Sequence, residues 1–415
     1  MKREDNDRIV AVGPNTPGGR MLRRYWHPIA LSEQLPKPDA PPLHAKLLGE
    51  RFTVFRDSAG KVGVLADRCM HRGVSLSMGR VEDGGIRCLF HGWKFDTDGN
   101  VLETPNDSSG VYVCKKRQPA FPVREQSGLI WTYIGPQDKI PPFREFIYDT
   151  VPDENRIVTR GNIKSSYLTM WEGGADSSHV GILHTNATRP NWGRTRRGEP
   201  TIPDVWDGLS PTYDAEDTEY GYRYVAFRAA PGREDRVSVR ISPEIMPGIR
   251  VLAGEKGDPT FDLLLIETPM DDNETATYSV YYSKTHALVQ HADMIKQMVG
   301  VTDDLFDPVT HDVKMSWPHN IMQDRDAMEC DNWSGYASIK PEDLAMTLSL
   351  GDDWDRTTEN LVAGDIAVIR LRRMLLRAIA SSEAGEDPPG VNMADLRDVH
   401  SAFQVIGKDE DWKSV

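Results

Sequence analysis

Two short segments each pair a cysteine with a histidine, and both residue types bind metals. The first segment is Cys69-Met70-His71 and the second is Cys88-Leu89-Phe90-His91. Two thiolates and two imidazoles that converge from two loops make a four-ligand metal site. Zinc accepts this donor set in a tetrahedral structural site. A [2Fe–2S] cluster accepts it as well, with both cysteines on one iron and both histidines on the other. The donor types by themselves leave both metals open.

A second group of possible ligands follows farther along the chain. Asp176 and His179 are three residues apart and share a face of a helix. His179 and His184 are five residues apart, and five steps turn an ideal helix through about 500°, so the two rings diverge. To share a metal, the helix must distort or end between them, which Gly181 permits. The alternative is two unrelated histidines near a helix end.

The elements that carry these residues differ between the two halves of the chain. From about residue 43 to 136, short alternating segments are separated by turns such as Asp57-Ser58-Ala59-Gly60, and this pattern predicts a small all-β domain around the cysteine loops. Gln137 to Pro142 resembles a linker. Beyond residue 150, the expected helices are Ser165–His184, Ala287–Gly300 and Asp365–Ala380, and the expected strands are Tyr222–Arg228, Arg236–Ile241, Asp262–Glu267 and Ala276–Tyr282. Residues 185–235 are polar and arginine-rich, and we expect weaker order there.

Length and composition narrow the class of protein. A chain of 415 residues with 39% hydrophobic residues can form two or three domains. It has no run of about 18 apolar residues, and its charged N-terminus lacks the apolar core of a signal peptide, so we expect a cytoplasmic protein without a membrane partner. The formal net charge of −14 argues against a nucleic-acid partner.

The two metal motifs together resemble the Rieske non-haem iron oxygenases, large subunit. The stretches Cys69-Met70-His71-Arg72-Gly73 and Cys88-Leu89-Phe90-His91-Gly92-Trp93-Lys94-Phe95 resemble the Rieske signature, and Asp176-x-x-His179-x-x-x-x-His184 resembles the family's iron motif. Gly13 to Gly19, Arg24 to Glu33, Asp355 to Leu361 and Asp365 to Leu376 resemble the phthalate-dioxygenase-like branch, so the resemblance extends over nearly the whole chain.

The resemblance implies a set of metal ligands. A Rieske [2Fe–2S] cluster is held by Cys69, His71, Cys88 and His91. His179 and His184 bind a mononuclear Fe(II), which a carboxylate completes into a two-His-one-carboxylate face. The stretch Gln323 to Glu329 resembles the family's Q-D-x-A-x-x-E pattern and places that carboxylate at Asp324. One extra residue precedes Ala327, which makes Asp326 a rival, and a helix N-cap is the alternative role of Asp324.

The resemblance also implies partners. The chain shows no nicotinamide or flavin site, so electrons are expected from an NAD(P)H-dependent flavin or iron–sulfur reductase. They enter at the cluster and pass to the mononuclear iron. Asp176 is expected to bridge His179 and a cluster histidine, His91, of a neighbouring subunit. The expected assembly is a homotrimer or a pair of trimers.

The branch includes oxygenases for phthalate, phenoxybenzoate and methoxylated lignin-derived acids, so an aromatic carboxylate is the expected substrate. Arginines on strand faces could bind its carboxylate through their planar fork, with Arg240 as the first candidate and Arg228 as the second. Arg189, Arg194, Arg196 and Arg197 could instead belong to a lid. The alternative for each arginine is a surface ion pair. Ring dihydroxylation and O-demethylation or ether oxidation use the same metals, and the sequence does not distinguish them.

The predicted architecture is therefore α+β. An N-terminal segment, residues 1–42, is expected to pack on the catalytic domain, followed by the Rieske domain at 43–142. The catalytic domain at 143–415 is expected to place helices over an antiparallel sheet in a helix-grip, START/Bet v 1-like fold. Two other functions remain open: a Rieske monooxygenase for a non-carboxylate substrate, and an electron-transfer Rieske protein with a non-catalytic ligand-binding domain.

Overall fold

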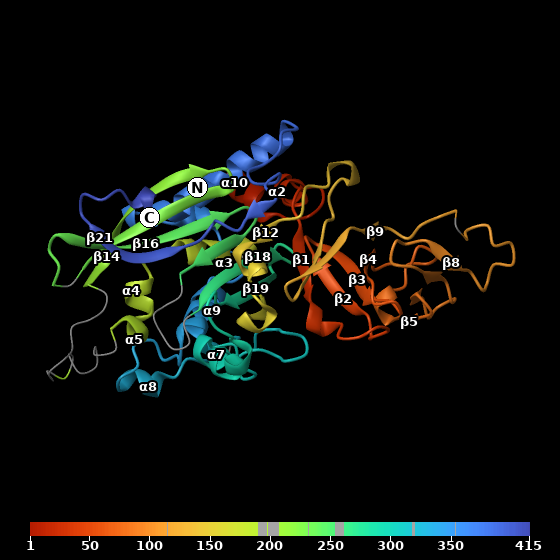
Figure 1. Ribbon diagram of the computed structural model, residues 1–415, viewed down its shortest axis with the longest axis horizontal. Coiled ribbons are helices and arrows are strands. Elements are labelled where there is room, and N and C mark those ends of the chain that lie inside the picture. The colour runs from red at the N-terminus through yellow and green to blue at the C-terminus, as the bar shows by residue number, and fades with distance from the viewer. Residues whose placement is uncertain are drawn as a thin grey trace. The chain divides into compact units, whose positions relative to one another are not determined.

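The computed structural model describes residues 1–113, 115–189, 197, 207–230, 232–253, 261–317, 320–352 and 354–415, with the backbone alone at 207–210 and 320. These residues form two compact units (Figure 1). The small unit contains Ala11–Phe143 and Thr268–Asp272. The large unit contains Met1–Val10, Arg144–Glu267 and Asn273–Val415. Arg189 and Arg197 of the predicted lid cluster are described, whereas Arg194 and Arg196 lie outside the described residues.

The small unit is built from short antiparallel strands in three sheets, as the turn-rich pattern predicts. One sheet has the order β2 (Leu43–Leu47), β3 (Glu50–Arg56), β4 (Val62–Ala66), β9 (Ala120–Phe121). The second has the order β5 (Arg80–Glu82), β6 (Gly85–Arg87), β7 (Lys94–Phe95), β8 (Val101–Glu103). The third has the order β1 (His27–Leu31), β11 (Leu129–Thr132), β10 (Val123–Gln126). The two cysteine loops follow β4 and β6.

The N-terminal 42 residues divide between the two units, so they do not pack as one segment. Helix α1 (Arg3–Val10) belongs to the large unit, where the Tyr167 hydroxyl donates to the Ile9 carbonyl oxygen at 2.8 Å. Helix α2 (Pro17–Leu22) and strand β1 belong to the small unit, and β1 pairs antiparallel with β11. Residues 11–42 therefore group with the small unit and not with a separate N-terminal segment. The sequence did not reveal this grouping, because the pairing partner of β1 lies about a hundred residues away.

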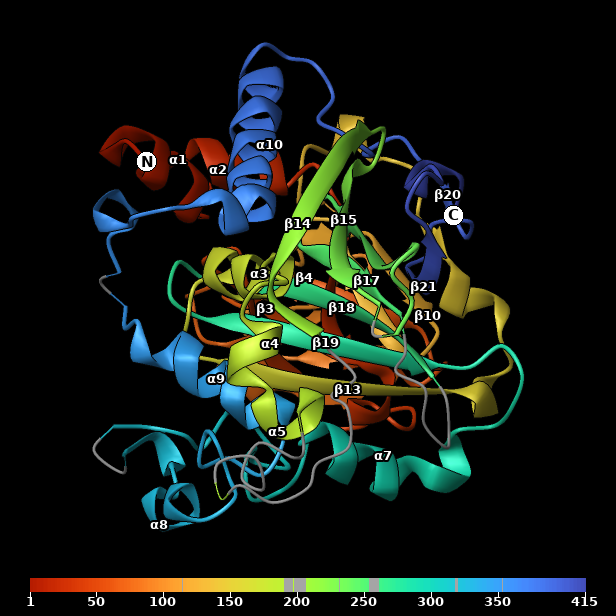
Figure 2. The same ribbon diagram turned by 90° about the vertical axis from the view of Figure 1, so that its left-hand side faces the viewer.

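The large unit contains one extensive antiparallel sheet (Figure 2). Its strand order is β13 (Arg156–Ile163), β19 (Thr275–Tyr282), β18 (Asp262–Pro269), β17 (Ile249–Leu252), β16 (Arg236–Ile245), β15 (Gly221–Ala229), β14 (Asp207–Thr218). Strand β21 (Ala402–Gly407) pairs with β16, and β12 (Glu145–Phe146) pairs separately with β20 (Asp395–Leu396). The four predicted strands are present, and β14 is a long strand where we expected weak order.

The helices that follow α1 in the described part of this unit are α3 (Tyr167–Ala175), α4 (Val180–Leu183), α5 (Thr185–Thr188), α7 (Ala292–Val299), α8 (Arg325–Glu329), α9 (Ile339–Ser349) and α10 (Ile366–Glu383). Two of them, α3 and α10, lie over one face of the sheet. The indole of Trp171 in α3 donates to Glu244 Oε2 at 2.5 Å, and the Tyr222 hydroxyl donates to the Ala367 carbonyl oxygen of α10 at 3.0 Å. Tyr222 and Glu244 are cross-strand partners on one face, so α3 and α10 lie over the same side of β15 and β16.

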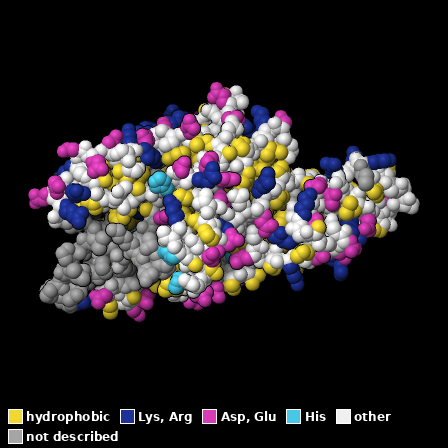
Figure 3. All heavy atoms as spheres, in the orientation of Figure 1, with side chains coloured by type: hydrophobic (Ala, Val, Ile, Leu, Met, Phe, Trp, Pro, Cys, Tyr) yellow, Lys and Arg dark blue, Asp and Glu magenta, His cyan; other side chains and the backbone are white. Residues whose placement is uncertain are grey.

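No helix in the described part of the chain is long and apolar enough to cross a membrane. On the face seen in Figure 3, acidic and basic side chains are interspersed rather than gathered by sign. Neighbouring charges of opposite sign offset one another, so this face carries no extended field of one sign.

A buried ion cluster anchors α3 to the C-terminal part of the chain. The Glu172 carboxylate accepts hydrogen bonds from Arg356 at 3.0 Å and from Arg372 at 2.6 Å, and Arg372 also pairs with Glu359. Glu172, Arg356 and Arg372 are all less than 10% exposed. Since Asp176 follows α3 directly, these ion pairs fix the helix from which the metal motif begins.

Replacing Glu172 by Ala should strongly destabilise the large unit, because two buried guanidinium groups would lose their shared carboxylate. Breaking such a buried pair costs about 3–5 kcal/mol. Chemical denaturation followed by circular dichroism measures the loss. Glu383→Ala is the matched control, since Glu383 pairs with Arg8 in a partly exposed ion pair and such pairs contribute at most about 1 kcal/mol. Equal, small losses in the two variants would show that the buried cluster does not anchor α3.

Candidate metal centres

The two cysteine loops have the same backbone geometry. In each loop the cysteine N–H donates to the carbonyl oxygen five residues later at 2.8 Å, and the glycine four residues later donates back to the cysteine carbonyl oxygen at 2.8–2.9 Å. These glycines are Gly73 and Gly92, with φ of 76° and 79°, a left-handed conformation that favours glycine. Each loop therefore turns tightly and presents one cysteine and one histidine.

The two cysteines lie within a packed core, and the two histidines are half-buried. Cys69 and Cys88 are buried with Leu76, Ile86 and Phe95. Burial raises the pKa of the Cys69 thiol to about 11, so the thiolate form needs a bound cation at neutral pH.

The two histidine rings lie together beside the buried cysteines. The centroids of His71 and His91 are 4.5 Å apart, and His71 stacks on Trp93 at 4.8 Å. His91 Nδ1 is buried and has no hydrogen-bond partner among the described residues. An orphaned ring nitrogen of this kind fits a metal ligand.

The arrangement of these donors separates the two metals that the sequence left open. A single tetrahedral zinc brings all its ligand atoms close to one another. Among the described residues, the only trio of metal-binding side chains with ligand atoms within 4.8 Å is His179, His184 and Asp343, so the cysteine–histidine set does not converge on one point. Paired cysteines and paired histidines fit the two irons of a cluster better than a single zinc.

The second histidine pair is positioned by a break in the helix. Helix α3 ends at Ala175 and Asp176 is its C-cap, whereas His179 and His184 flank the single turn of α4. At His184 the backbone leaves the helical conformation, with φ −90° and ψ 34°, before α5 begins. The predicted continuous helix is therefore three short helices, and the breaks bring the two ring centroids to 5.1 Å.

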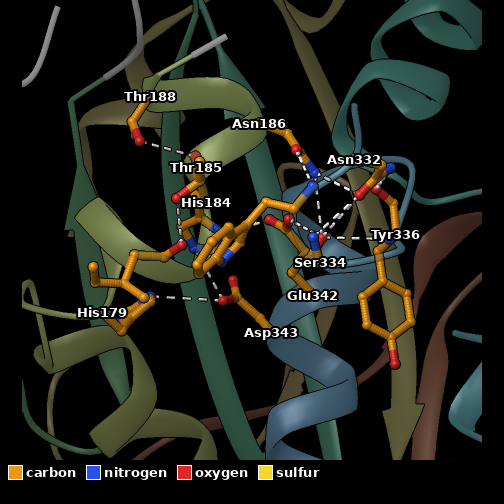
Figure 4. A network of polar contacts seen from close by, with 12 residues as sticks. His179, His184, Thr185, Asn186, Thr188, Asn332, Ser334, Tyr336, Glu342 and Asp343 are labelled. Atoms are coloured by element: carbon orange, nitrogen blue, oxygen red, sulfur yellow. Dashed lines mark hydrogen bonds and ion pairs between the residues drawn. The ribbon is translucent and has the colours of Figure 1, made fainter. Parts of the chain in front are cut away.

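Asp343 of α9 supplies the carboxylate between the two rings (Figure 4). Its Oδ1 lies 3.1 Å from His184 Nε2 and 3.6 Å from His179 Nε2. Two imidazoles and one carboxylate on one side of a space form the ligand face typical of non-haem Fe(II), with positions left open for O₂ and substrate. The donor set therefore fits one hard to borderline divalent cation.

A further carboxylate contacts the opposite edge of each ring. Asp176 Oδ2 lies 3.4 Å from His179 Nδ1, and Glu342 Oε2 lies 2.6 Å from His184 Nδ1. Burial lowers the pKa of His184, but hydrogen bonds to Asp343 and Glu342 outweigh it and raise this pKa to about 9. The negative surroundings that stabilise a proton on His184 also favour a cation beside it.

The structure does not place Asp324, the predicted third ligand, beside the two histidines, and it does not place the alternative, Asp326, there either. Asp324 is the N-cap of α8, where its carboxylate accepts from the Ala327 N–H at 2.8 Å, and both aspartates are exposed and outside the metal trio. The helix-cap alternative for Asp324 holds. Asp343-Leu344-Ala345 fits the D-x-A spacing without an inserted residue, and that match could have identified Asp343.

The predicted arginines have different surroundings. Arg228 is buried, and its guanidinium donates to the Ser177 carbonyl oxygen at 2.6 Å and to Ser177 Oγ at 3.0 Å. It therefore holds the loop after Asp176. Arg240 is half-buried on the same sheet face, opposite Ala226. Arg189 donates to the Gly181 carbonyl oxygen at 3.1 Å, and Arg197 pairs with exposed Asp331.

Replacing Asp343 by Ala should remove the mononuclear metal and leave the cysteine-bound cluster intact, because only the trio loses a ligand. Asp324→Ala is the matched control and should keep both metals, with a loss of about 1 kcal/mol in stability from the missing helix cap. Iron content together with visible absorbance distinguishes the two sites. If the Asp324 variant loses the mononuclear iron and the Asp343 variant keeps it, the third ligand is Asp324, as the sequence pattern suggested.

Comparison with known proteins agrees with both centres. The Rieske [2Fe–2S] domain family matches residues 25–122, and the family "LigXa C-terminal domain like" matches residues 132–415. The chain is 33% identical to the phthalate 4,5-dioxygenase oxygenase subunit of Pseudomonas putida, over 99% of this chain and 93% of that protein. It is 31% identical to the 3-chlorobenzoate-3,4-dioxygenase oxygenase subunit of Comamonas testosteroni, over 99% and 96%.

Solved structures share the fold at lower identity. The terminal oxygenase of carbazole 1,9a-dioxygenase from Nocardioides aromaticivorans IC177 superposes with a TM-score of 0.59 at 16% identity, covering 93% of this chain and 98% of that chain. Dicamba monooxygenase bound to dicamba gives a TM-score of 0.58 at 15% identity, covering 88% and 99%. The chain therefore belongs to the Rieske non-haem iron oxygenases, as an oxygenase subunit of the phthalate-dioxygenase-like branch that uses a [2Fe–2S] cluster and a mononuclear iron.

Proposed function

We propose that this chain oxidises an aromatic carboxylate with O₂ and with electrons from a separate NAD(P)H-dependent reductase. The cluster is held by Cys69, His71, Cys88 and His91. The mononuclear iron is held by His179, His184 and Asp343, and when bound it supplies the O₂ chemistry that the protein side chains lack. The remaining residues of the site bind and orient the substrate and hold the histidine ligands in place.

The observation that carries the substrate class is the surroundings of Arg240. Its guanidinium makes no ion pair or hydrogen bond with another described residue, although the side chain is half-buried. It lies close enough to Arg228 for the two positive charges to interact, and Arg228 contacts Ser177 beside Asp176. A half-buried guanidinium without a carboxylate partner, on the sheet face that carries the metal motif, supports an acidic ligand.

The two residues directly opposite Arg240 in the sheet carry no charge. They are Ala226 of β15 and Phe403 of β21. Tyr224 lies on the same face two residues before Ala226 and provides an aromatic surface. An arginine next to an aromatic side chain can bind the carboxylate of a benzoate-like acid while the ring packs against the tyrosine.

The names of several relatives support this class. Beside the phthalate and chlorobenzoate enzymes, the chain is 29% identical to phenoxybenzoate dioxygenase subunit alpha and 26% identical to the 5,5'-dehydrodivanillate O-demethylase oxygenase subunit, over 92% and 94% of this chain. The substrates in these names are aromatic and acidic. The names include both dioxygenases and an O-demethylase. We therefore propose that the type of oxidation depends on how the protein orients the substrate over the iron.

One relative favours a second candidate function. The tert-butanol monooxygenase / tert-amyl alcohol desaturase oxygenase subunit of Aquincola tertiaricarbonis is 40% identical over 58% of this chain and 51% of that protein. Its named substrates are small neutral alcohols. A monooxygenase for a neutral substrate is therefore the alternative, and it does not use Arg240 as an anion anchor.

Replacing Arg240 by Ala should raise KM for an acid substrate about ten- to hundredfold, because a charge-assisted hydrogen bond in a partly dry pocket contributes roughly 1.5–3 kcal/mol. Turnover of the neutral ester should change little, and Arg240→Lys should recover only part of the loss. Arg236→Ala is the matched control, as an exposed arginine of the same strand. Steady-state assays with a reductase, NADH and paired acids and esters provide the measurement. Better turnover of neutral alcohols than of every acid would favour the alternative.

We further propose that Asp176 connects the iron site to the cluster of a neighbouring subunit in a homotrimer or a pair of trimers. Its Oδ2 approaches His179 Nδ1, and its Oδ1 accepts from the Ser178 N–H and hydroxyl at 2.7 and 2.6 Å. The carboxylate is thereby held in one orientation while remaining about a quarter exposed, which leaves an edge accessible to a second histidine. This supports a bridge between two imidazoles rather than a ligand to iron.

Asp176→Asn should keep both metals but slow electron transfer from the cluster at least tenfold, since the substitution alters the bridge and not the ligands. The rate is measured by stopped-flow absorbance of the reduced cluster after mixing with O₂ and substrate. Asp326→Asn makes the same chemical change at an exposed position and should have the wild-type rate. A wild-type rate in the Asp176 variant would exclude the bridging role.

A further inference from the structure

Two consecutive residues of α9 hold opposite edges of one imidazole ring. Glu342 Oε2 lies 2.6 Å from His184 Nδ1, and Asp343 Oδ1 lies 3.1 Å from His184 Nε2 (Figure 4). Only one of these carboxylates also approaches the other histidine, since His179 contacts Asp343 but not Glu342. Asp343 thus lies on the metal side of the ring, and Glu342 lies behind it.

The surroundings of Glu342 determine the direction of its hydrogen bonds. Glu342 is 2% exposed. Its second oxygen, Oε1, accepts the Ser334 hydroxyl proton at 2.5 Å. A carboxylate can only accept, so the proton in the short contact to His184 belongs to Nδ1. With Nδ1 protonated, the lone pair of the neutral ring is on Nε2, the nitrogen that faces Asp343.

The loop that supports Glu342 also supports the backbone after His184. Asn332 Oδ1 accepts from the Gly335 N–H at 2.7 Å and from Asn186 Nδ2 at 2.8 Å. Asn186 Oδ1 in turn accepts from the Trp333 N–H at 2.8 Å. Asn186 lies two residues after His184, and Glu342 contacts the His184 ring. One loop, residues 332–336, therefore binds both the chain that follows His184 and the carboxylate that contacts its ring (Figure 4).

A backbone contact rigidifies this loop. Gly335 has a φ of 77°, and a Cβ atom there would lie 2.6 Å from the Asp324 carbonyl oxygen. The Asp324 N–H donates to the Gly335 carbonyl oxygen at 3.0 Å. The segment in which the sequence pattern placed the third iron ligand therefore packs against the loop that supports Glu342.

We infer that Glu342 is a positioning residue for the mononuclear iron: it fixes the tautomer and the ring orientation of His184 and raises the basicity of Nε2. The inference rests on the proposed iron site of His179, His184 and Asp343. A carboxylate behind a metal-binding histidine acts in this way, and its loss costs about ten- to hundredfold in metal affinity or activity. Glu342 does not touch the metal or the substrate.

The test is Fe(II) binding to the full chain from which the mononuclear iron has been removed while the cluster is retained. Glu342→Ala removes the acceptor and should raise the Fe(II) Kd about ten- to hundredfold. Glu342→Gln keeps a neutral acceptor of similar size and should fall between Ala and wild type. Glu329→Ala is the matched control, because Glu329 is an exposed glutamate of α8. Cluster absorbance should be that of wild type in all variants that fold, and Glu329→Ala should also keep the wild-type thermal unfolding midpoint.

A kinetic readout separates positioning from substrate binding. Excess Fe(II) should restore most of the turnover of Glu342→Gln, with KM for the aromatic substrate unchanged. If Glu342→Ala fails to fold, the near-isosteric Gln variant decides. An Fe(II) Kd within about threefold of wild type in the Gln variant, and in the Ala variant where it folds, would overturn the inference.

His184→Ala distinguishes this failure from failure of the proposed site. If His184→Ala loses Fe(II) binding while the Glu342 variants bind Fe(II) with wild-type affinity, Glu342 does not position the ligand. The proposed iron site would still stand. Wild-type Fe(II) binding in His184→Ala would instead show that the iron lies elsewhere, and the role of Glu342 would fail with it.

Discussion

The placement of one carboxylate between two imidazoles is the constraint on which the catalytic unit depends. His179 and His184 come from one segment and Asp343 comes from α9, so the trio forms only if the chain breaks its helix twice and α9 packs against the break. Gathering a carboxylate and two imidazoles at partly buried positions costs free energy, because these groups lose hydration. A bound cation or a proton between them offsets this cost. Hydrogen bonds to Asp343 and Glu342 raise the pKa of His184, and the same negative surroundings favour a cation there.

Buried polar contacts around the motif hold the segment that carries the two histidines in place. Glu172 binds two arginines and fixes α3, Arg228 fixes the carbonyl oxygen of Ser177, and Glu342 fixes the ring of His184. Each contact satisfies a group that would be costly to bury alone. Together they hold a segment of short helices in one conformation, although its own helical hydrogen bonds are few.

The two metal centres differ in their donor atoms and in the elements that position them. In the small unit, a pair of equivalent glycine turns presents cysteines within a hydrophobic core, and soft thiolates suit an iron–sulfur cluster. In the large unit, hard carboxylate and borderline imidazole donors come together around the buried His184, and this donor set suits Fe(II) with open positions. The first centre is local in sequence, whereas the second requires residues more than 150 positions apart.

That difference explains what could be predicted from the sequence. The all-β domain, the main strands of the sheet, the family and its two metal cofactors were readable because each depends on a short pattern: a C-x-H loop, a C-x-x-H loop, alternation or helical spacing. Glu342 and the environment of Arg240 were not, since each depends on which distant element packs nearby. Asp343 matches the D-x-A spacing, but only the packing of α9 places it beside the two histidines. The pattern around Asp324 resembled the ligand motif, yet its carboxylate caps its own helix. A carboxylate pattern records residue type and spacing, but only tertiary packing decides whether that carboxylate faces a metal, an N–H group or solvent.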